Sequence, residues 1–434
     1  MKLYFKAVDT EINIKDFLKI KNTFYYENDN YIYLGKGDLV EVDEIEALEE
    51  ILDVKVENSN QEFPFIGGFF GIFNYDLIKT YEKIPQENKA ILDTKNILGL
   101  DVKTFYVFDK KSGVKSICSL NTSTTMGKVE ALENIKNMYK QLTQSNTSEE
   151  LFNASRQKTI KSNTTKKEFI EKVKKAKEYI INGDIFQVVL SQRFEVDFER
   201  DPSELLEKIK HEQSTFKYYF NLKNIQVMGL SPEILVKRQG DNVITNPIAG
   251  TRKRGESKAE EKILEKELLS DAKEKAEHTM LVDLARNDMG KIAEIGSVQV
   301  KNFMNIKRYK KVIHLTSEVL GKSHENNYEI LKTFLPAGTL TGAPKIRAME
   351  IIESLEKDKR EIYGGGIGYL SLNENMETAI TIRTMIIKDK KAYIQAGAGI
   401  VYDSIPEREY EETVEKASQL IDLMKEVAND FTNR

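Results

Sequence analysis

Residues 185–194 read IFQVVLSQRF, and the apolar run Val188-Val189-Leu190 inside this stretch predicts a β-strand. Two later runs, 227–230 (VMGL) and 379–382 (AITI), predict strands for the same reason. Between them, apolar residues of 277–285 repeat at helical spacing. Helices and strands alternate irregularly, and adjacent strand runs suggest hairpins. We therefore expect an α+β fold with large, mostly antiparallel sheets rather than a doubly wound parallel sheet.

Composition changes along the chain suggest its division into parts. Residues 1–144 contain short strand-like runs separated by turns, and residues 145–165 are rich in Ser, Thr, Asn, Gln and Lys, as in a surface connection. Thr165 and Glu168 have the spacing of a capping box, which predicts the start of a helix. We expect an N-terminal part, this connection, and a larger domain over residues 166–430.

The overall composition restricts the class of protein. The chain has 434 residues, 40% hydrophobic and 31% charged, which is typical of soluble proteins. The net charge of -4 gives no electrostatic footprint for nucleic acid. No apolar run approaches the length of a membrane span, and the first residues lack the pattern of a secretory signal. The sequence predicts a cytoplasmic protein that binds neither membranes nor nucleic acid.

Cysteine and histidine usage restricts the metal chemistry. Cys118 is the only cysteine, so a disulfide framework and a thiolate metal cluster are both excluded. The four histidines do not have the spacing of a zinc site. Any bound metal should therefore be held by carboxylates, and this favours magnesium.

Two helical stretches carry carboxylates three residues apart. Glu274 and Glu277 form one pair, and Glu409 and Glu412 form the other. Three residues is nearly one helical turn, so the members of each pair share a face. Taken alone, either pair is typical of a solvated surface. The pairs would have a common function only if they converge, because four close carboxylates repel one another unless a cation neutralises them.

His314 lies in the alternating run Val312–Thr316, which predicts a strand whose opposite face carries Ile313 and Leu315. A single histidine in a strand is more often a hydrogen-bonded structural residue than a catalyst. Spacing alone does not decide between these two roles.

A series of stretches from residue 185 onward resembles the chorismate-utilising enzymes, and most closely the synthase components of anthranilate synthases. They read IFQVVLSQRF, GLSPEIL, NPIAGTRKRG, EKAEHTMLVDLARND, VIHLTSEV, LPAGTLTGAPKIRAMEII, YGGGIGYL, TAITIRTM and IQAGAGIVYDSIPEREYEET. Near the N-terminus, FIGGFFGIFNYDLI resembles the glycine–aromatic segment of the same family. The resemblance is strong over about residues 165–425 and implies two large antiparallel sheets flanked by helices, with the active site in a cleft.

The resemblance also implies a magnesium site and a chorismate site in the 166–430 domain. It assigns Mg²⁺ to Glu277 and Glu412, with Glu274 and Glu409 in or just outside the coordination shell. The residues expected to bind chorismate are Gly250 and Thr251 at the ring carboxylate, and Tyr363, Arg383, Gly397 and Gly399 at the enolpyruvyl carboxylate.

In the implied reaction, ammonia adds to the ring beside its carboxylate and the ring hydroxyl leaves. Glu233 would protonate the departing hydroxyl, and His314 would assist the later loss of pyruvate, because its pKa allows proton transfer near neutrality. Thr251 is grouped with these two residues as a member of the catalytic set.

Two positions distinguish branches of the family. Relatives that use water as the nucleophile carry Lys where this chain has Gln187, and an amide cannot act as a base at neutral pH. Many aminodeoxychorismate synthases carry Lys where this chain has Ala249. Both positions favour anthranilate synthesis, in tryptophan biosynthesis. The alternatives are the aminodeoxychorismate synthase of the folate branch and a catalytically silent regulatory homologue.

The resemblance further implies a partner and a regulator. The chain has no glutaminase motif, so a glutamine amidotransferase subunit is expected to supply ammonia within a heterodimer or heterotetramer. Relatives that tryptophan inhibits bind it with Leu-Leu-Glu-Ser and Asn-Pro-Ser-Pro-Tyr segments, which align here with residues 25–28 (YYEN) and 212–216 (EQSTF). Glu27 is retained, but both prolines and the first Asn are lost, which predicts weak inhibition by tryptophan or none.

Overall fold

The computed structural model describes residues 1–57, 63–144, 160–212, 214–308 and 312–430, and in these ranges twenty strands join one antiparallel network. The strands are β1 (Lys2–Ala7), β2 (Thr23–Glu27), β3 (Tyr31–Val42), β4 (Gly68–Phe73), β5 (Ile97–Asp109), β6 (Lys115–Asn121), β7 (Ile160–Ser162), β8 (Gln187–Asp197), β9 (Phe216–Leu222), β10 (Ile225–Ser231), β11 (Ile234–Gln239), β12 (Asn242–Thr245), β13 (Ile248–Lys253), β14 (Gln299–Arg308), β15 (Val312–Lys322), β16 (Gly342–Ala343), β17 (Gly366–Ser371), β18 (Met376–Ile380), β19 (Thr384–Lys388) and β20 (Lys391–Ile400).

The network divides into two arms at β5. One arm runs from β5 through β3, β2, β9, β10, β19 and β20 to β8. The other runs from β5 through β4, β17, β18, β11 and β12 to β15, with which β13 and β14 also pair. The α+β fold with large antiparallel sheets is confirmed. The two expected sheets are the two arms of one hydrogen-bonded network.

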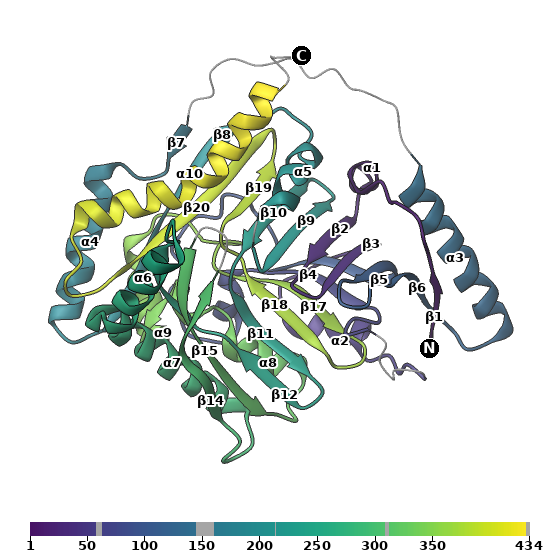
Figure 1. Cartoon of the computed structure of the whole chain (residues 1–434), viewed down its shortest axis with the longest axis horizontal. Helices are drawn as coiled ribbons and strands as arrows, with labels where there is room; N and C mark the ends of the chain where they lie inside the picture. The colour runs from purple at the N-terminus through teal and green to yellow at the C-terminus, as the bar shows by residue number, and fades with distance from the viewer. Residues whose placement is uncertain (58–62, 145–159, 213, 309–311, 431–434) are drawn as a thin grey trace.

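Helices cover the outer faces of the arms. They are α1 (Ile14–Leu18), α2 (Glu49–Leu52), α3 (Thr125–Thr143), α4 (Lys166–Ile181), α5 (Ser203–His211), α6 (Lys258–Ser270), α7 (Ala272–Ile292), α8 (Asn327–Phe334), α9 (Lys345–Leu355) and α10 (Pro406–Asp430), with the short 3-10 helices η1 (Ile45–Leu48), η2 (Tyr75–Thr80) and η3 (Gly338–Leu340). In Figure 1, α10 lies across β20 beside α4, while α7 packs against β13 and β15.

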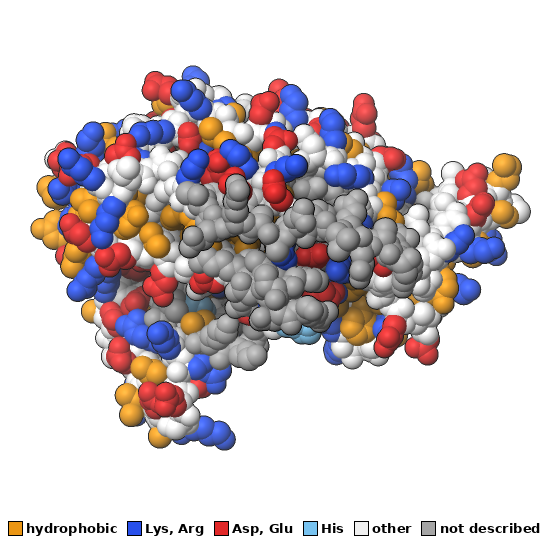
Figure 2. All heavy atoms as spheres, turned by 90° about the horizontal axis from the view of Figure 1, so that it is seen from above, with side chains coloured by type: hydrophobic (Ala, Val, Ile, Leu, Met, Phe, Trp, Pro, Cys, Tyr) orange, Lys and Arg blue, Asp and Glu red, His pale blue; other side chains and the backbone are white. Residues whose placement is uncertain are grey.

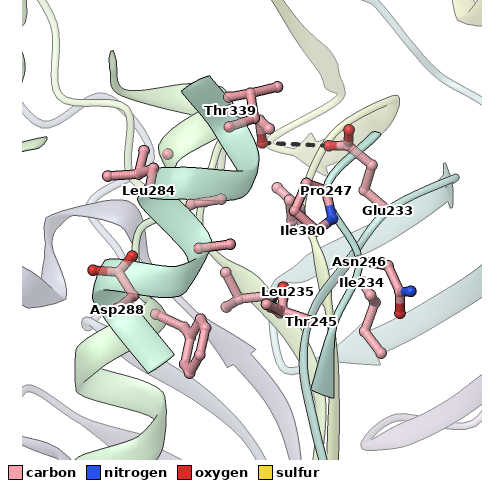
Figure 3. A pocket seen from close by; sticks show the side chains of 15 residues that line it. Glu233, Ile234, Leu235, Thr245, Asn246, Pro247, Leu284, Asp288, Thr339 and Ile380 are labelled. Carbon is pink, nitrogen blue, oxygen red and sulfur yellow. Dashed lines mark hydrogen bonds between the residues drawn. The ribbon is translucent and has the colours of Figure 1, made fainter. Parts of the chain in front are cut away.

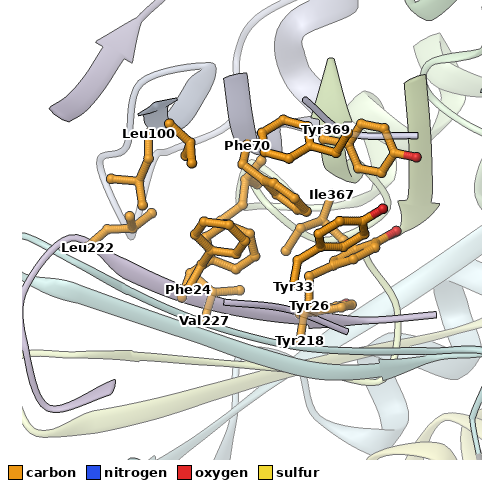
Figure 4. Packing of buried hydrophobic residues seen from close by; sticks show 14 of the residues in the cluster. Phe24, Tyr26, Tyr33, Phe70, Leu100, Tyr218, Leu222, Val227, Ile367 and Tyr369 are labelled. Carbon is orange, nitrogen blue, oxygen red and sulfur yellow. The ribbon is translucent and has the colours of Figure 1, made fainter. Parts of the chain in front are cut away.

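Aromatic side chains fill the core between the arms (Figure 4). Phe24 and Tyr33 come from one arm and Phe70 and Tyr369 from the other, and all four are fully buried. The ring centroids of Phe24 and Phe70 are 4.3 Å apart. Each such ring removes about 150–250 Å² from water, so this packing is a major contribution to the stability of the fold. N-terminal and C-terminal strands therefore share one core.

Helix boundaries agree with the local sequence signals. The Thr165 hydroxyl accepts a hydrogen bond from the Glu168 backbone N–H (3.2 Å), and the Glu168 carboxylate accepts one from the Thr165 N–H (2.8 Å), which completes the predicted capping box of α4. Pro344 precedes α9, whose last residue is Leu355. The connection predicted for residues 145–165 lies mostly outside the described residues, and the division into parts stays a prediction.

The strand predicted over residues 379–382 is too long, because β18 ends at Ile380. The Thr381 N–H donates to the Gly365 carbonyl (3.0 Å), and the Thr381 carbonyl accepts from the Gly364 N–H (3.0 Å). The backbone groups of Thr381 are therefore hydrogen-bonded to a loop and cannot bond to a neighbouring strand. Arg383 follows with a positive φ of 48°. Apolar periodicity does not reveal this competition.

The exposed surface carries charges of both signs. On the face drawn in Figure 2, Lys and Arg side chains alternate with Asp and Glu side chains around the residues left in grey. Within the described ranges, no helix combines the length and the apolar character needed to cross a membrane.

Candidate active site

Two helices bring four carboxylates together: Glu274 and Glu277 from α7, and Glu409 and Glu412 from α10. Burial raises the pKa of Glu277; Lys273 opposes the increase, and the other three carboxylates add to it. Burial likewise raises the pKa of Glu409, with a further contribution from Glu412. The carboxylates of the two pairs are therefore near enough to influence one another's pKa, and their convergence on one cation stays a prediction.

Cationic side chains partly neutralise this carboxylate cluster. Arg252 contacts Glu274 at 3.0 Å, and Lys416 contacts Glu412 at 2.6 Å. Among the described residues, no group of three or more His, Cys, Asp or Glu side chains is arranged to hold a metal ion in its present geometry. The donor chemistry nevertheless fits Mg²⁺, because every candidate ligand is a carboxylate and a divalent cation would relieve their repulsion. The Mg²⁺ assignment stays a prediction.

His314 is connected to the carboxylate cluster through Gly250. A bulge in β13 separates Ala249, opposite Leu315, from Thr251, opposite His314, and Gly250 between them has a φ of +63°. The His314 Nδ1 lies 2.9 Å from the Gly250 carbonyl oxygen, and a Cβ at Gly250 would lie 3.0 Å from a Glu274 oxygen. Glycine therefore allows the close approach of β13 to α7 and the turn that the bulge requires.

The protonation of His314 follows from its surroundings. The side chain is buried, and burial lowers its pKa, a shift that the Gly250 hydrogen bond opposes and the Arg383 charge reinforces. The ring is therefore neutral at pH 7. Since the Gly250 carbonyl can only accept, Nδ1 is the donor, and Nε2 is the basic nitrogen.

Glu233 lies between β10 and β11 and lines a cavity of about 50 Å³ (Figure 3). The Thr339 hydroxyl donates a hydrogen bond of 3.4 Å to its carboxylate. Burial raises the pKa of Glu233 to about 7, although Arg383, Lys416 and the Thr339 hydrogen bond lower it. A carboxyl group with this pKa can donate a proton near neutrality, as a general acid must.

Glycines on β20 approach the side chains of two predicted site residues. A Cβ at Gly397 would lie 2.8 Å from the Tyr363 hydroxyl, and a Cβ at Gly399 would lie 2.6 Å from the Gln187 side-chain nitrogen. Burial raises the pKa of Tyr363, so its phenol remains a hydrogen-bond donor at neutral pH. The structure thus places the side chains of Tyr363 and Gln187 against two glycines of β20.

Arg383 lies between β18 and β19, where backbone contacts hold it. Its carbonyl accepts a hydrogen bond of 3.1 Å from the Leu230 N–H, and its φ of 48° lies in the left-handed region. A non-glycine residue in this conformation is strained, and such residues are common at functional sites. The Arg383 charge lowers the pKa of Glu233 and of His314.

Two residues near the site were not predicted from the sequence. Lys416 donates to the Gly397 carbonyl (3.0 Å) and pairs with Glu412, so it connects the carboxylate cluster to β20. Thr339 contacts Glu233. Lys416 follows Glu412 by four residues, which is a recognisable helical ion pair, but that spacing gave no reason to place it near Gly397.

Comparisons with known proteins agree on one family. Residues 11–422 match the model of the chorismate binding enzymes. Anthranilate synthase component 1 of Aquifex aeolicus (strain VF5) is 43% identical over 401 residues, which are 89% of this chain and 80% of that protein. The crystal structure of anthranilate synthase component I from Streptococcus pneumoniae TIGR4 is 35% identical, with a TM-score of 0.76, and the match covers 96% of this chain and 91% of that one.

A more distant structure shares the fold. The menaquinone-specific isochorismate synthase MenF of Escherichia coli is 19% identical, with a TM-score of 0.77, and the match covers 97% of this chain and 94% of that one. The architecture is therefore common to proteins whose names state different products.

Proposed function

This chain belongs to the chorismate binding enzyme family, and from that premise we propose that it is the synthase subunit of an anthranilate synthase. The reaction converts chorismate and ammonia to anthranilate, pyruvate and water, in tryptophan biosynthesis. The observation that supports the proposal is that the Arg383 charge acts on both the Glu233 carboxyl, which can donate a proton near neutrality, and the His314 ring, which can accept one.

Substrate binding uses groups on both sides of this site. Arg383 and Tyr363 hold the enolpyruvyl carboxylate, the first with a planar fork of donors and the second with a phenol that keeps its proton. Gly250 and Thr251 approach the ring carboxylate from the β13 bulge. Mg²⁺, when bound to the cluster of Glu277 and Glu412 with Glu274 and Glu409 nearby, supplies positive charge to that carboxylate.

The chemistry needs one acid and one base. Ammonia forms a C–N bond beside the ring carboxylate while the ring C–O bond to the hydroxyl breaks, and Glu233 protonates the hydroxyl so that water leaves. In the second step, Nε2 of His314 accepts a proton from the ring and the ether bond breaks, so that the ring becomes aromatic and pyruvate leaves as its enolate. The enolate then takes up a proton at its methylene carbon to give pyruvate.

The choice of ammonia as nucleophile rests on Gln187. Its amide lies against the backbone of Gly399, and an amide cannot activate water as a base. Cys118 is fully buried on β6, so it is not placed to attack glutamine. Ammonia from glutamine therefore requires a separate amidotransferase subunit, and the enzyme is a cytoplasmic, Mg²⁺-dependent lyase.

The test is an assay of purified protein with chorismate, Mg²⁺ and ammonium at mildly alkaline pH. We expect anthranilate and pyruvate in equal amounts, and no product with glutamine until an amidotransferase subunit is added. Formation of 4-amino-4-deoxychorismate without pyruvate would assign the chain to the folate branch. Chorismate binding without any turnover would indicate a catalytically silent homologue.

A further inference from the structure

Arg360 is almost completely buried in the segment between α9 and β17, and its guanidinium contacts several elements at once. Nη1 donates to the Leu340 carbonyl (2.6 Å), and Nη2 donates to the Val189 carbonyl (2.7 Å). Its carbon atom Cζ lies 5.8 Å from the centre of the Tyr363 ring and 4.8 Å from that of Tyr75. One side chain thus contacts η3, β8, the loop before β17, and η2.

Glu356 fixes the orientation of this guanidinium. It accepts bonds from Arg360 Nε (2.9 Å) and Nη2 (2.7 Å), which form a two-pronged contact. The same carboxylate accepts from the Ser191 N–H (2.8 Å) and hydroxyl (2.9 Å) on β8. A charge pair this deeply buried is costly to desolvate, so its hydrogen bonds must be nearly complete for the fold to tolerate it.

The elements that Arg360 joins carry residues of the candidate active site. Leu340 follows Thr339, which contacts Glu233, and Val189 is two residues from Gln187 on β8. Tyr363, three residues after Arg360, faces Gly397. A shift of the guanidinium would therefore move three parts of the site together.

We propose that Arg360 is a positioning residue: with Glu356 it sets the spacing between the Thr339 loop, β8 and the Tyr363 ring, and so sets the shape of the chorismate site. The inference rests on the proposed function for the identity of the groups it positions. Lysine cannot replace it, because an ammonium is a single point of charge, whereas the planar guanidinium reaches the carboxylate and both carbonyls in fixed directions.

The experiment compares Arg360→Lys with Arg238→Lys. Arg238 is a matched control, because it is also buried, pairs with Glu374 at 3.2 Å and donates to the carbonyls of Gly240 (2.8 Å) and Glu325 (2.9 Å), and none of these partners belongs to the candidate site. Chorismate binding is measured by calorimetry without ammonia, together with KM, kcat and the melting temperature. For Arg360→Lys, we expect the chorismate Kd and KM to rise ~10–100-fold and kcat to fall less than that. Binding groups that are out of position weaken the binding of chorismate even when the protein still folds.

The control separates positioning from general stability. Arg238→Lys should lower the melting temperature as much as Arg360→Lys does and leave the chorismate Kd near the wild-type value. Equal effects of the two variants on Kd would overturn the proposal. If Arg360→Lys does not fold, Glu356→Gln decides, since it keeps Arg360 and removes the charge that aligns it: a Kd like that of Arg238→Lys would also overturn the proposal.

The binding measurement is independent of the proposed reaction. Wild-type protein that binds chorismate but makes no anthranilate would contradict the proposed function and leave the comparison of the variants intact.

Discussion

The burial of Glu233 in its cavity predicts how the reaction rate depends on pH. Burial raises its pKa to about 7, so the acid form needed for catalysis falls about tenfold for each pH unit above that value. The concentration of free ammonia changes in the opposite direction, because it increases as the pH rises. We therefore predict that the rate, measured at a fixed concentration of free ammonia, falls as the pH rises above 7. A rate independent of pH between 6 and 9 would contradict Glu233 as the acid.

The same raised pKa predicts a pH-dependent stability. Because the folded-state pKa exceeds the ordinary value of 4.5, the contribution of Glu233 to stability is present at low pH and is lost as the pH rises from 4.5 to 7. Glu233→Gln should thus be more stable than wild type at pH 8.5, by on the order of 2 kcal/mol, and similar to it at pH 5. Urea unfolding at both pH values tests this, with the exposed Glu411→Gln as a control.

Single residues of the site were predictable to different degrees. Glu277 and Glu412 were identified because spacing along a helix is local, and the resemblance gave their role. Lys416 was missed because its contact with Gly397 depends on how α10 packs on β20, which no local pattern encodes. The resemblance supplied Glu233, but its raised pKa comes from burial by several separate elements.

At the scale of elements, α7 and α10 each supply one carboxylate pair to the proposed metal site. Replacing Glu277 or Glu412 with Gln removes one ligand and also relieves repulsion within the carboxylate cluster. We predict that Mg²⁺ raises the melting temperature of the wild type but much less that of either variant, that both variants lose turnover, and that neither is less stable without metal. Glu411→Gln, on the same helix and paired with Lys166, should respond to Mg²⁺ like the wild type. Normal activity of both cluster variants at low Mg²⁺ would exclude the assignment.

Elements were predicted best where a local signal decides their ends. The capping box at Thr165 predicted the start of α4, because this signal acts within one turn. The end of β18 was not predictable, since Thr381 is bound by the distant Gly364–Gly365 loop. The order of strands in the two arms is likewise set by contacts between remote segments, and no local pattern indicated it.

At the scale of the whole molecule, β2 pairs with β9 and so joins the N-terminal strands to the later part of the chain. The two segments that the resemblance aligns with a tryptophan site, residues 25–28 and 212–216, meet at this junction. Here, Tyr25 and Tyr26 on β2 are fully buried, and the Tyr26 ring lies 6.0 Å from that of Phe216 on β9. Of the second aligned segment, Gln213 lies outside the described residues, and the Ser214 hydroxyl donates to the Ser231 carbonyl at 2.8 Å. Side chains of the protein itself therefore occupy much of this junction.

Glu27, which would have to accept the amino group of an effector, already has cationic partners. Lys110 lies 2.7 Å and Lys217 3.5 Å from its carboxylate, and the Tyr25 hydroxyl donates to it. Burial would raise the pKa of Glu27, but the hydrogen bonds from Lys110 and Tyr25 and the two lysine charges lower it, so the carboxylate is ionised and neutralised within the protein. An incoming ammonium would have to displace a lysine, at the cost of leaving that lysine unpaired in a partly buried place.

We therefore predict that tryptophan inhibits this enzyme weakly or not at all. The measurement is the initial velocity at increasing tryptophan, with chorismate near its KM. Lys110→Met serves as a gain-of-function test, because removing the lysine frees one side of Glu27 for an amino group and should increase inhibition if the lysine is the obstacle. Half-inhibition of the wild type at micromolar tryptophan would show instead that the rings of β2 and β9 move apart to admit an indole, and that this part of one arm can open without loss of the fold.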